Sequence, residues 1–338
     1  VGELYLELHR GTYTSIAKNK RNNRKSELLC QALESAAVMD EVLLDGVYPK
    51  EELHKAWKNI LLNQFHDIIP GSSIYEVYQK TDEEYAALLA MGGKLYDGIL
   101  QKLAEEIDTQ GGLLVYNPTS FTQSGIADYE GRKLYVRNIP GHGYRVVKET
   151  AAGNGITYEN KVLETPFYQI IFDEEMNMIS LYDKEMDRQA AAGKMNQIRI
   201  YEDYPRGWDA WDISNYYPEK EYAVPKVDKV TAQSCGNGFC ITVEKSFLQS
   251  HMIQRMYVYE DSRRIDFDME MDWDQAHQLM KMAFPIAVHA TEASYDIQFG
   301  NIKRPTHRNT SWDQAKFEVC AHKWADLSED DYGVSILN

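Results

Sequence analysis

The chain has 338 residues and a formal net charge of −16, because 52 Asp and Glu outnumber 36 Lys and Arg. This acidic balance disfavours nucleic-acid and anionic-membrane partners, since phosphates would be repelled. No apolar run approaches the roughly 20 residues that a membrane-spanning helix needs. A hydrophobic share of 43% with 23 tyrosines is typical of folded domains. Four cysteines make no disulfide framework in this length, so we expect thiols and a reducing, cytoplasmic setting.

Both ends of the sequence look internal. The chain begins at Val1 in a strand-like run over residues 3–8, and it stops at Asn338 just after a second such run over residues 332–337. Natural termini are usually polar and frayed. We therefore expect the chain to be a middle piece of a longer polypeptide.

A helical pattern extends from about Thr14 to Asp108. Apolar residues recur there at close to 3.6-residue spacing in three stretches, over residues 28–43, 53–61 and 77–107. Pro70-Gly71 breaks the second stretch, and Ser73 followed by Glu76 predicts a capping box at the start of the third. The pattern predicts a three-helix bundle.

After Gly111-Gly112 the apolar spacing changes to two, which indicates β-strands. The expected strands cover residues 113–116, 134–136, 144–147, 168–172, 198–201, 239–243, 256–259, 265–271, 295–299 and 317–320. We therefore predict an α+β multidomain chain: a three-helix bundle over residues 1–110, a small β domain over 111–150, and a large antiparallel β-sandwich, truncated, over 151–338.

The pair His66-Asp67 is the most informative polar feature, at the end of an amphipathic helix and just before Pro70-Gly71. An imidazole is a good zinc ligand, and the neighbouring carboxylate can bind metal or accept a hydrogen bond from a substrate hydroxyl. The ordinary alternative is a protonated His at a helix C-terminus with Asp67 in a turn. A metal site also needs two or three more ligands, and no His-x-x-His or Cys-x-x-Cys lies nearby.

The string Leu62–Ser72, LNQFHDIIPGS, strongly resembles the middle-domain signature of α-mannosidases of glycoside hydrolase family 38. Further stretches over residues 7–15, 304–313 and 322–329 are similar to the bacterial and vacuolar branch of that family. The resemblance covers essentially the whole chain.

The resemblance implies an N-terminal α/β catalytic domain, a three-helix middle bundle and C-terminal β-domains that complete the active-site cleft. It implies a retaining exoglycosidase in which one zinc ion, held by two His and two Asp, binds the hydroxyls of a terminal mannose. His66 would be the last His ligand, and Asp67 would contact the same sugar. Animal members usually have two adjacent His where this chain has Phe65-His66, and the second aligns with His66. The nucleophile, the acid/base and the other ligands would belong to the N-terminal domain.

Two other segments contain groups that suit a sugar. The run from Asp203 to Asp212 holds Trp208 and Trp211, whose faces would stack on pyranose C–H bonds while carboxylates accept hydroxyls. The alternative is a sandwich-edge loop whose tryptophans fill an interdomain core. Arg10 and Tyr13 would meet sugar oxygens beside the catalytic domain, or else serve in interdomain packing.

A basic run over residues 18–25 lacks the interleaved aromatics of a nucleic-acid site, so it predicts a charged helix face. Neither nucleic acid nor a membrane is an expected partner, and assembly into a homo-oligomer stays open.

The sequence thus predicts a fragment of a metal-dependent retaining α-mannosidase that hydrolyses terminal α-linked mannose from glycans or oligosaccharides. A retaining glycosidase needs two carboxyl groups about 5–5.5 Å apart. No carboxyl pair in this chain is singled out as that dyad, so the fragment alone is expected to be inactive without the N-terminal catalytic domain of the same polypeptide. The alternative is a non-catalytic carbohydrate-binding β-sandwich module with an architectural bundle. Linkage preference and metal identity stay open.

Overall fold

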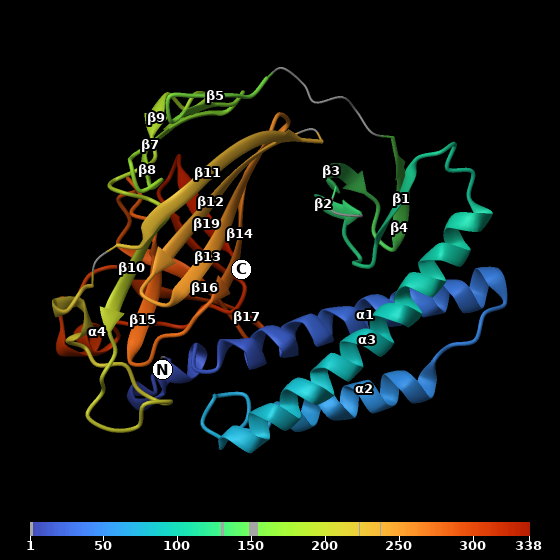
Figure 1. The fold of residues 1–338 in the computed structure, drawn as a ribbon, viewed down its shortest axis with the longest axis horizontal. Coiled ribbons are helices and arrows are strands. Elements are labelled where there is room, and N and C mark those ends of the chain that lie inside the picture. Colours follow the sequence, from blue (N-terminus) through green and yellow to red (C-terminus); the bar gives the residue numbers. More distant parts are fainter. Residues whose placement is uncertain (1–2, 130–131, 149–154, 223, 237) are drawn as a thin grey trace. The chain divides into compact units, whose positions relative to one another are not determined.

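The computed structural model describes residues 3–129, 132–148, 155–222, 224–236 and 238–338 (Figure 1). Contacts divide the chain into two compact units. Gly11–Thr150 forms one, called here the helical unit, and Val1–Arg10 with Ala151–Asn338 forms the other, called the β unit. The predicted α+β class, a three-helix bundle followed by antiparallel β-structure, is confirmed. The contacts place the bundle and the small β-structure in one unit. The predicted boundaries of three domains stay a prediction.

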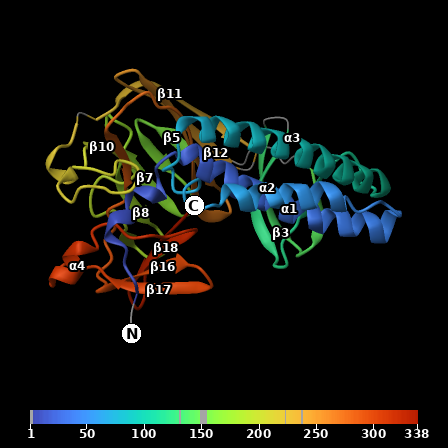
Figure 2. The ribbon, with the colours of Figure 1, turned by 90° about the horizontal axis from the view of Figure 1, so that it is seen from below.

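Three helices form the bundle of the helical unit: α1 (Ala17–Leu44), α2 (Lys50–Asn63) and α3 (Tyr75–Glu106) (Figures 1 and 2). Their apolar stripes meet in one core, which includes Cys30, Leu33, Ala36, Leu53, Ile60, Tyr85, Leu88, Ile99 and Leu103. Burial of these side chains, rather than helix propensity alone, holds helices of this length together.

The small β-structure of the helical unit consists of two strand pairs. β1 (Leu113–Asn117) pairs with β4 (Gly143–Val147), and β2 (Gln123–Tyr129) pairs with β3 (Arg132–Ile139). Leu134, Val136 and Ile139 form its core. The sequence analysis missed β2 because its residues, QSGIADY, are mostly small or polar and give little β signal.

Two packed sheets build the sandwich of the β unit. One has the order β5 (Thr157–Glu159), β6 (Val162–Glu164), β7 (Tyr168–Phe172), β8 (Met178–Asp183) and β9 (Arg188–Gln189); the other has β11 (Lys226–Cys235), β12 (Gly238–Phe247), β13 (Ser250–Tyr259) and β14 (Ser262–Asp272). Their inner faces share one core, which includes Leu163, Ile170, Met178, Leu181, Ile241, Val243, Met256 and Val258. This shared core is what defines a sandwich.

Two smaller sheets complete the β unit. β10 (Gln197–Glu202) pairs with β15 (Gln278–Ala283), and a four-stranded sheet has the order β17 (Gly300–Pro305), β16 (Glu292–Ile297), β18 (Trp324–Ser328) and β19 (Gly333–Leu337). The short helix α4 (Ser311–Ala315) begins with a capping box between Thr310 and Asp313. Three single-turn 3₁₀ segments are η1 (Glu7–His9), η2 (Gly11–Tyr13) and η3 (Tyr217–Glu219).

Two predicted strands are wrong. Residues 3–6 are irregular and are followed by η1. Residues 317–320 are also irregular, because two of their carbonyls accept side-chain donors and do not take part in a backbone ladder. The Tyr5 hydroxyl donates to the carbonyl of Glu318 at 2.5 Å, and the Arg304 guanidinium donates to the carbonyl of Cys320 at 2.8 Å. Arg304 also pairs with the Glu3 carboxylate, which holds the pKa of that carboxyl below its usual range.

The predicted capping box at Ser73 and Glu76 is also wrong. Helix α3 begins at Tyr75 after Ile74, and no side chain caps it. The Ser73 hydroxyl instead donates to the carbonyl of Asp67 at 2.5 Å. The serine therefore stabilises the preceding loop and not the helix.

Candidate functional site

The residues of the strongest sequence motif form a tight loop between α2 and α3, called here the His66 loop (residues 64–73). Helix α2 ends at Asn63, and the Phe65 carbonyl then accepts the amides of Ile68 and Ile69 at 2.8 and 3.0 Å. Pro70 follows directly and cannot continue the helix because it has no N–H. The chain is thus turned back within a few residues, with His66 and Asp67 at the bend.

Helix α1 holds the backbone of the His66 loop from one side. The Asn19 amide donates to the carbonyl of Ile68 at 3.1 Å. The Lys20 ammonium donates to the carbonyl of Ile69 at 2.8 Å and also to the carbonyl of Ser15. Burial lowers the pKa of Lys20 to about 8. Lys20 is therefore a positioning residue and not part of the solvated charged face that the basic run predicts.

Helix α3 holds the same loop from the other side. The Tyr78 hydroxyl donates to the carbonyl of Ile68 at 3.1 Å and accepts the amide of Ser73 at 3.0 Å. With the Ser73 hydroxyl on the carbonyl of Asp67, three successive carbonyls, from Asp67 to Ile69, have side-chain donors. Such bonds, each worth about 1 kcal/mol net, fix the backbone while leaving the side chains at its tip unconstrained.

Gly71 allows the loop to close against the segment that precedes α1. Its φ is +95°, a conformation that favours glycine, and a Cβ built there would lie 2.6 Å from the carbonyl oxygen of Ser15. The motif therefore requires glycine at this position for two reasons, backbone conformation and close approach.

His66 and Asp67 lie side by side at the tip of the loop. The distance between His66 Nε2 and Asp67 Oδ2 is 3.5 Å, and their side chains are 75% and 51% exposed. The His66 ring also packs on the Phe65 ring, with 4.2 Å between the centroids. An imidazole nitrogen and a carboxylate oxygen, both possible metal ligands, are thus presented to solvent on a fixed backbone. This is the arrangement of a partial binding site.

Tyr13 belongs to the helical unit and ends η2. The next residues, Thr14 and Ser15, donate their amides back to the carbonyl of Gly11, and Ser15 is the residue that Gly71 approaches. The structure therefore brings the segment of Tyr13 against the His66 loop. Its side chain is about half exposed, and its predicted sugar contact stays a prediction.

Arg10 belongs to the β unit, where it is nearly buried, with 10% of its side chain exposed. Its guanidinium donates to Asp212 Oδ1 at 3.1 Å, to the carbonyl of Ala315 at 2.9 Å and to the Tyr5 hydroxyl at 3.1 Å. It also lies 4.3 Å from the centroid of the Phe317 ring. This geometry favours the packing alternative for Arg10, while its predicted contact with a sugar stays a prediction.

The run from Asp203 to Asp212 separates its two tryptophans. Trp208 is largely exposed and has a φ of +65°, whereas the Trp211 ring packs edge-on against His9 at 5.2 Å. Burial, and next the charge of Asp209, raises the pKa of Asp203. One tryptophan thus fits each of the two interpretations that the sequence left open, solvent display for Trp208 and packing for Trp211.

Neither a complete metal site nor a membrane-spanning helix is present in the part of the chain that the structure describes. Within residues 3–129, 132–148, 155–222, 224–236 and 238–338, no group of three or more His, Cys, Asp or Glu could hold a metal ion. Over the same residues, no helix has the length and apolar character to cross a membrane. His66 and Asp67 therefore make at most part of a metal site.

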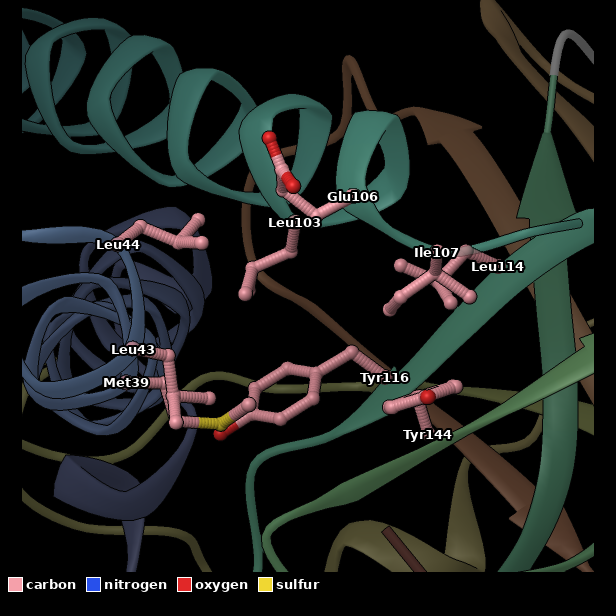
Figure 3. A pocket seen from close by; sticks show the side chains of 9 residues that line it. All are labelled: Met39, Leu43, Leu44, Leu103, Glu106, Ile107, Leu114, Tyr116 and Tyr144. Carbon is pink, nitrogen blue, oxygen red and sulfur yellow. The ribbon is translucent and has the colours of Figure 1, made fainter.

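An apolar pocket of about 210 Å³ lies in the helical unit, between the C-terminal ends of α1 and α3 and the strands β1 and β4 (Figure 3). Met39, Leu43, Leu103 and Ile107 are among its walls, and Figure 3 shows the Tyr116 ring reaching toward Met39. The Tyr116 hydroxyl is hydrogen-bonded to Ser35 at 2.7 Å. The pocket lacks the array of polar groups that a sugar site needs.

The sequence analysis missed the residues that position the His66 loop. In the sequence they are ordinary polar positions of two amphipathic helices: Asn19, Lys20 and Tyr78. Only the fold shows that their side chains donate hydrogen bonds to the loop carbonyls. The sequence carries no signal for Asn19, because its burial in the first turn of α1 follows only from the fold.

Two family models match the chain. The model "Alpha mannosidase middle domain" matches residues 7–103, and "Glycosyl hydrolases family 38 C-terminal domain" matches residues 163–338, more than half of the chain. The first match covers the bundle up to residue 103 in α3 and includes the His66 loop, and the second covers most of the sandwich.

Curated relatives match over the full chain. Alpha-mannosidase G of Dictyostelium discoideum is 30% identical, Alpha-mannosidase 2C1 of Homo sapiens 31%, and Alpha-mannosidase of Saccharomyces cerevisiae 34%, each over 100% of this chain. The chain spans 37%, 34% and 32% of these relatives, about a third of their length.

A solved α-mannosidase from Enterococcus faecalis V583 has the same fold, with a TM-score of 0.77 at 13% identity over 97% of this chain and 49% of that one. A second structure, a glycosyl hydrolase family 38 protein from Enterococcus faecalis, gives a TM-score of 0.75 at 14% identity, over 100% of this chain and 52% of that one. Family models, relatives and fold agree: the chain belongs to glycoside hydrolase family 38 and carries the middle and C-terminal domains of its α-mannosidases.

Proposed function

We propose that this chain is part of a metal-dependent retaining α-mannosidase that removes terminal α-linked mannose from glycans or oligosaccharides. One observation carries the proposal: His66 and Asp67 lie 3.5 Å apart at the exposed tip of a loop whose backbone two helices hold in place. Polar side chains that a fixed backbone presents to solvent are suited to recognition.

The donor set at the loop tip fits one side of a zinc site. An imidazole nitrogen and a carboxylate oxygen are both zinc donors, yet catalytic zinc takes at least three protein ligands. His66 would supply one ligand, and the others would come from an N-terminal catalytic domain of the same polypeptide. When bound, the metal would supply a positive charge that holds and polarises sugar hydroxyls.

The chain's own residues have positioning roles in this proposal. The Asp67 carboxylate would accept a hydrogen bond from a mannose hydroxyl, and Phe65 limits the rotation of the His66 ring by packing on it. Because the carbonyls of residues 67–69 already have donors, the loop would not need to reorganise when substrate binds. Tyr13 and Arg10 remain proposed sugar contacts, of which Tyr13 has the more exposed side chain.

The surface next to the His66 loop supports a second domain as partner. Large apolar side chains in the loop and on either side of it in sequence are exposed: Leu61, Leu62, Phe65, Ile74 and Tyr75. Exposed apolar side chains of this size commonly mark interaction surfaces. We propose that the catalytic domain of the same polypeptide covers them, and that the isolated chain is inactive because the nucleophile and the acid/base lie in that domain.

The four cysteines, all within the described residues, are thiols and not disulfides. This state supports, as a further proposal, a reducing and cytoplasmic location.

The test uses the full-length protein with two loop variants. His66→Ala should remove most of the bound metal and the activity together, because it deletes a ligand. Asp67→Asn should leave the metal bound while weakening transition-state binding by about 2–4 kcal/mol. His54→Ala, at an exposed histidine of α2, is the matched control and should change neither. Full metal occupancy and near-normal turnover in His66→Ala would contradict the proposal.

A further inference from the structure

A second pocket lies in the β unit, where β10 ends and the following segment folds back through η3. It has a volume of about 170 Å³. Its walls include Glu202, Tyr204, Ser214, Tyr216, Glu219 and Lys220. We call it the tyrosine pocket. Tyr204 belongs to the run from Asp203 to Asp212, whereas the other walls of the pocket lie outside that run and outside the His66 loop.

Hydrogen bonds fix the backbone around the tyrosine pocket. The amide of Glu202 donates to the carbonyl of Lys220 at 2.9 Å, which joins the end of β10 to the end of η3. Tyr217 is a further wall of the pocket; its hydroxyl donates to Glu318 at 2.7 Å and its ring packs against Tyr201 at 5.0 Å. The pocket is therefore formed by ordered chain.

Two tyrosine rings of the pocket face solvent. Tyr204 is 67% exposed and Tyr216 is 63% exposed. The Tyr204 ring is supported from behind by His277, with 4.6 Å between the centroids. Aromatic rings held in place but left exposed are suitable platforms for the C–H faces of a pyranose ring, since they lose little conformational freedom on binding.

The polar groups of the pocket suit hydroxyls and not anions. The Glu202 carboxylate accepts the Lys220 ammonium at 2.6 Å, and the Ser214 hydroxyl accepts the amide of Tyr216 at 3.3 Å. The Glu219 carboxylate belongs to an exposed residue that lines the pocket. Two carboxylates against one ammonium leave a net negative charge, which repels phosphates and acidic sugars. A neutral ligand rich in hydroxyl groups matches both the aromatic walls and this charge.

We propose that the tyrosine pocket binds one saccharide unit of a neutral, mannose-containing glycan. Tyr216 and Tyr204 stack on the sugar ring, and Glu219 accepts hydrogen bonds from its hydroxyls. The identity of the sugar as mannose rests on the proposed function, whereas the preference for a neutral saccharide rests on the pocket alone.

Calorimetric titration of the 338-residue chain tests the proposal, with an α-linked mannotriose, cellotriose and a sialylated trisaccharide as ligands. We expect saturable millimolar binding of mannotriose, a loss of at least tenfold in affinity in Tyr216→Ala and in Glu219→Gln, and no binding of the sialylated sugar. Trp312→Ala is the matched control, because Trp312 is an aromatic residue of the same unit with 77% exposure that is not in the pocket. It should bind within twofold of the unmodified chain.

The outcomes distinguish failure of the pocket proposal from failure of the proposed function. No saturable binding of mannotriose, or equal affinity of Tyr216→Ala and the unmodified chain, would overturn the pocket even if the full-length protein cleaves α-mannosides. Tighter binding of cellotriose than of mannotriose would overturn its assignment to mannose. Binding that depends on Tyr216, together with a full-length protein inert toward α-mannosides, would support the pocket and contradict the proposed function.

Discussion

The His66 loop and the contact between Arg10 and Asp212 use similar residue types in opposite ways. In the loop, side chains from α1 and α3 satisfy the backbone, so His66 and Asp67 remain exposed. At the Arg10–Asp212 contact, the charged side chains themselves make the structural bonds. The Arg10 guanidinium is nearly buried among its acceptors, one of which is the Asp212 carboxylate. The side chains of His66 and Asp67 are therefore available for recognition, whereas the Arg10 guanidinium already makes structural contacts.

The largest effect is expected from Arg10→Ala. The substitution leaves the Asp212 carboxylate without its cation and removes the packing on Phe317, so the free energy of unfolding of the β unit should fall by about 3 kcal/mol or more. Tryptophan fluorescence during urea unfolding measures it. The control is Arg206→Ala, at an exposed arginine of the run from Asp203 to Asp212, and it should cost less than about 0.5 kcal/mol. Equal effects would show that Arg10 is not a structural contact.

A smaller loss is expected from Gly71→Ala. The new Cβ would clash with the Ser15 carbonyl and strain a backbone with φ of +95°, so the helical unit should lose about 2–3 kcal/mol. The helical circular dichroism signal during unfolding measures it. The control is Gly98→Ala in α3, where a Cβ meets open space and should stabilise the helix by about 0.5–1 kcal/mol. The same sign in both variants would contradict this account of the His66 loop.

Lys20 should make the free energy of unfolding of the helical unit depend on pH. Its pKa is about 8 in the folded state against 10.5 in an unfolded chain, so between these values only the unfolded state holds the extra proton. Its contribution to the free energy of unfolding therefore rises with pH above about 8, by about 1–2 kcal/mol at pH 10, and is constant below pH 8. The neutral amine keeps two N–H groups for its two carbonyl acceptors.

Urea unfolding of the chain and of Lys20→Met at pH 7, 8.5 and 10 measures this contribution as the difference between the two proteins. The difference should shift in favour of the unmodified chain as the pH rises. A shift in the opposite direction would mean that the ammonium charge itself holds the loop.

The smallest effect is expected from His66→Ala and Asp67→Ala on stability. Both side chains are exposed and their backbone is held by other residues, so each should change the free energy of unfolding by less than about 0.5 kcal/mol. The helical circular dichroism signal during urea unfolding measures it. A loss above 2 kcal/mol would place these residues among the structural ones and remove the contrast with Arg10.

Much of the fold followed from spacing in the sequence. The apolar stripes of the three helices and the alternating strands of the sandwich are local patterns, so periodicity indicates them without knowledge of the partners. The strand over 317–320 was wrong because the carbonyls of Glu318 and Cys320 bond with side chains distant in sequence, of Tyr5 and Arg304. No local pattern carries that information.

The candidate site was predicted only in part. The motif indicated His66 and Asp67, yet neither the anchoring by Asn19 and Tyr78 nor the use of Ser73 on the loop was foreseen. These bonds join three separate stretches of chain. For Arg10 the sequence left sugar contact and packing open, because a guanidinium suits a sugar hydroxyl and a carbonyl equally well; its surroundings favour packing, and the sugar contact stays a prediction.

The length of α3 has a consequence for how this unit can be altered. A helix of 32 residues spans about 48 Å. It carries the His66 loop before its first residue, while its last turn supplies walls of the apolar pocket. Substitutions so far apart contribute to stability almost independently. Larger side chains can therefore be introduced at the pocket end to raise stability without disturbing the His66 loop at the other end.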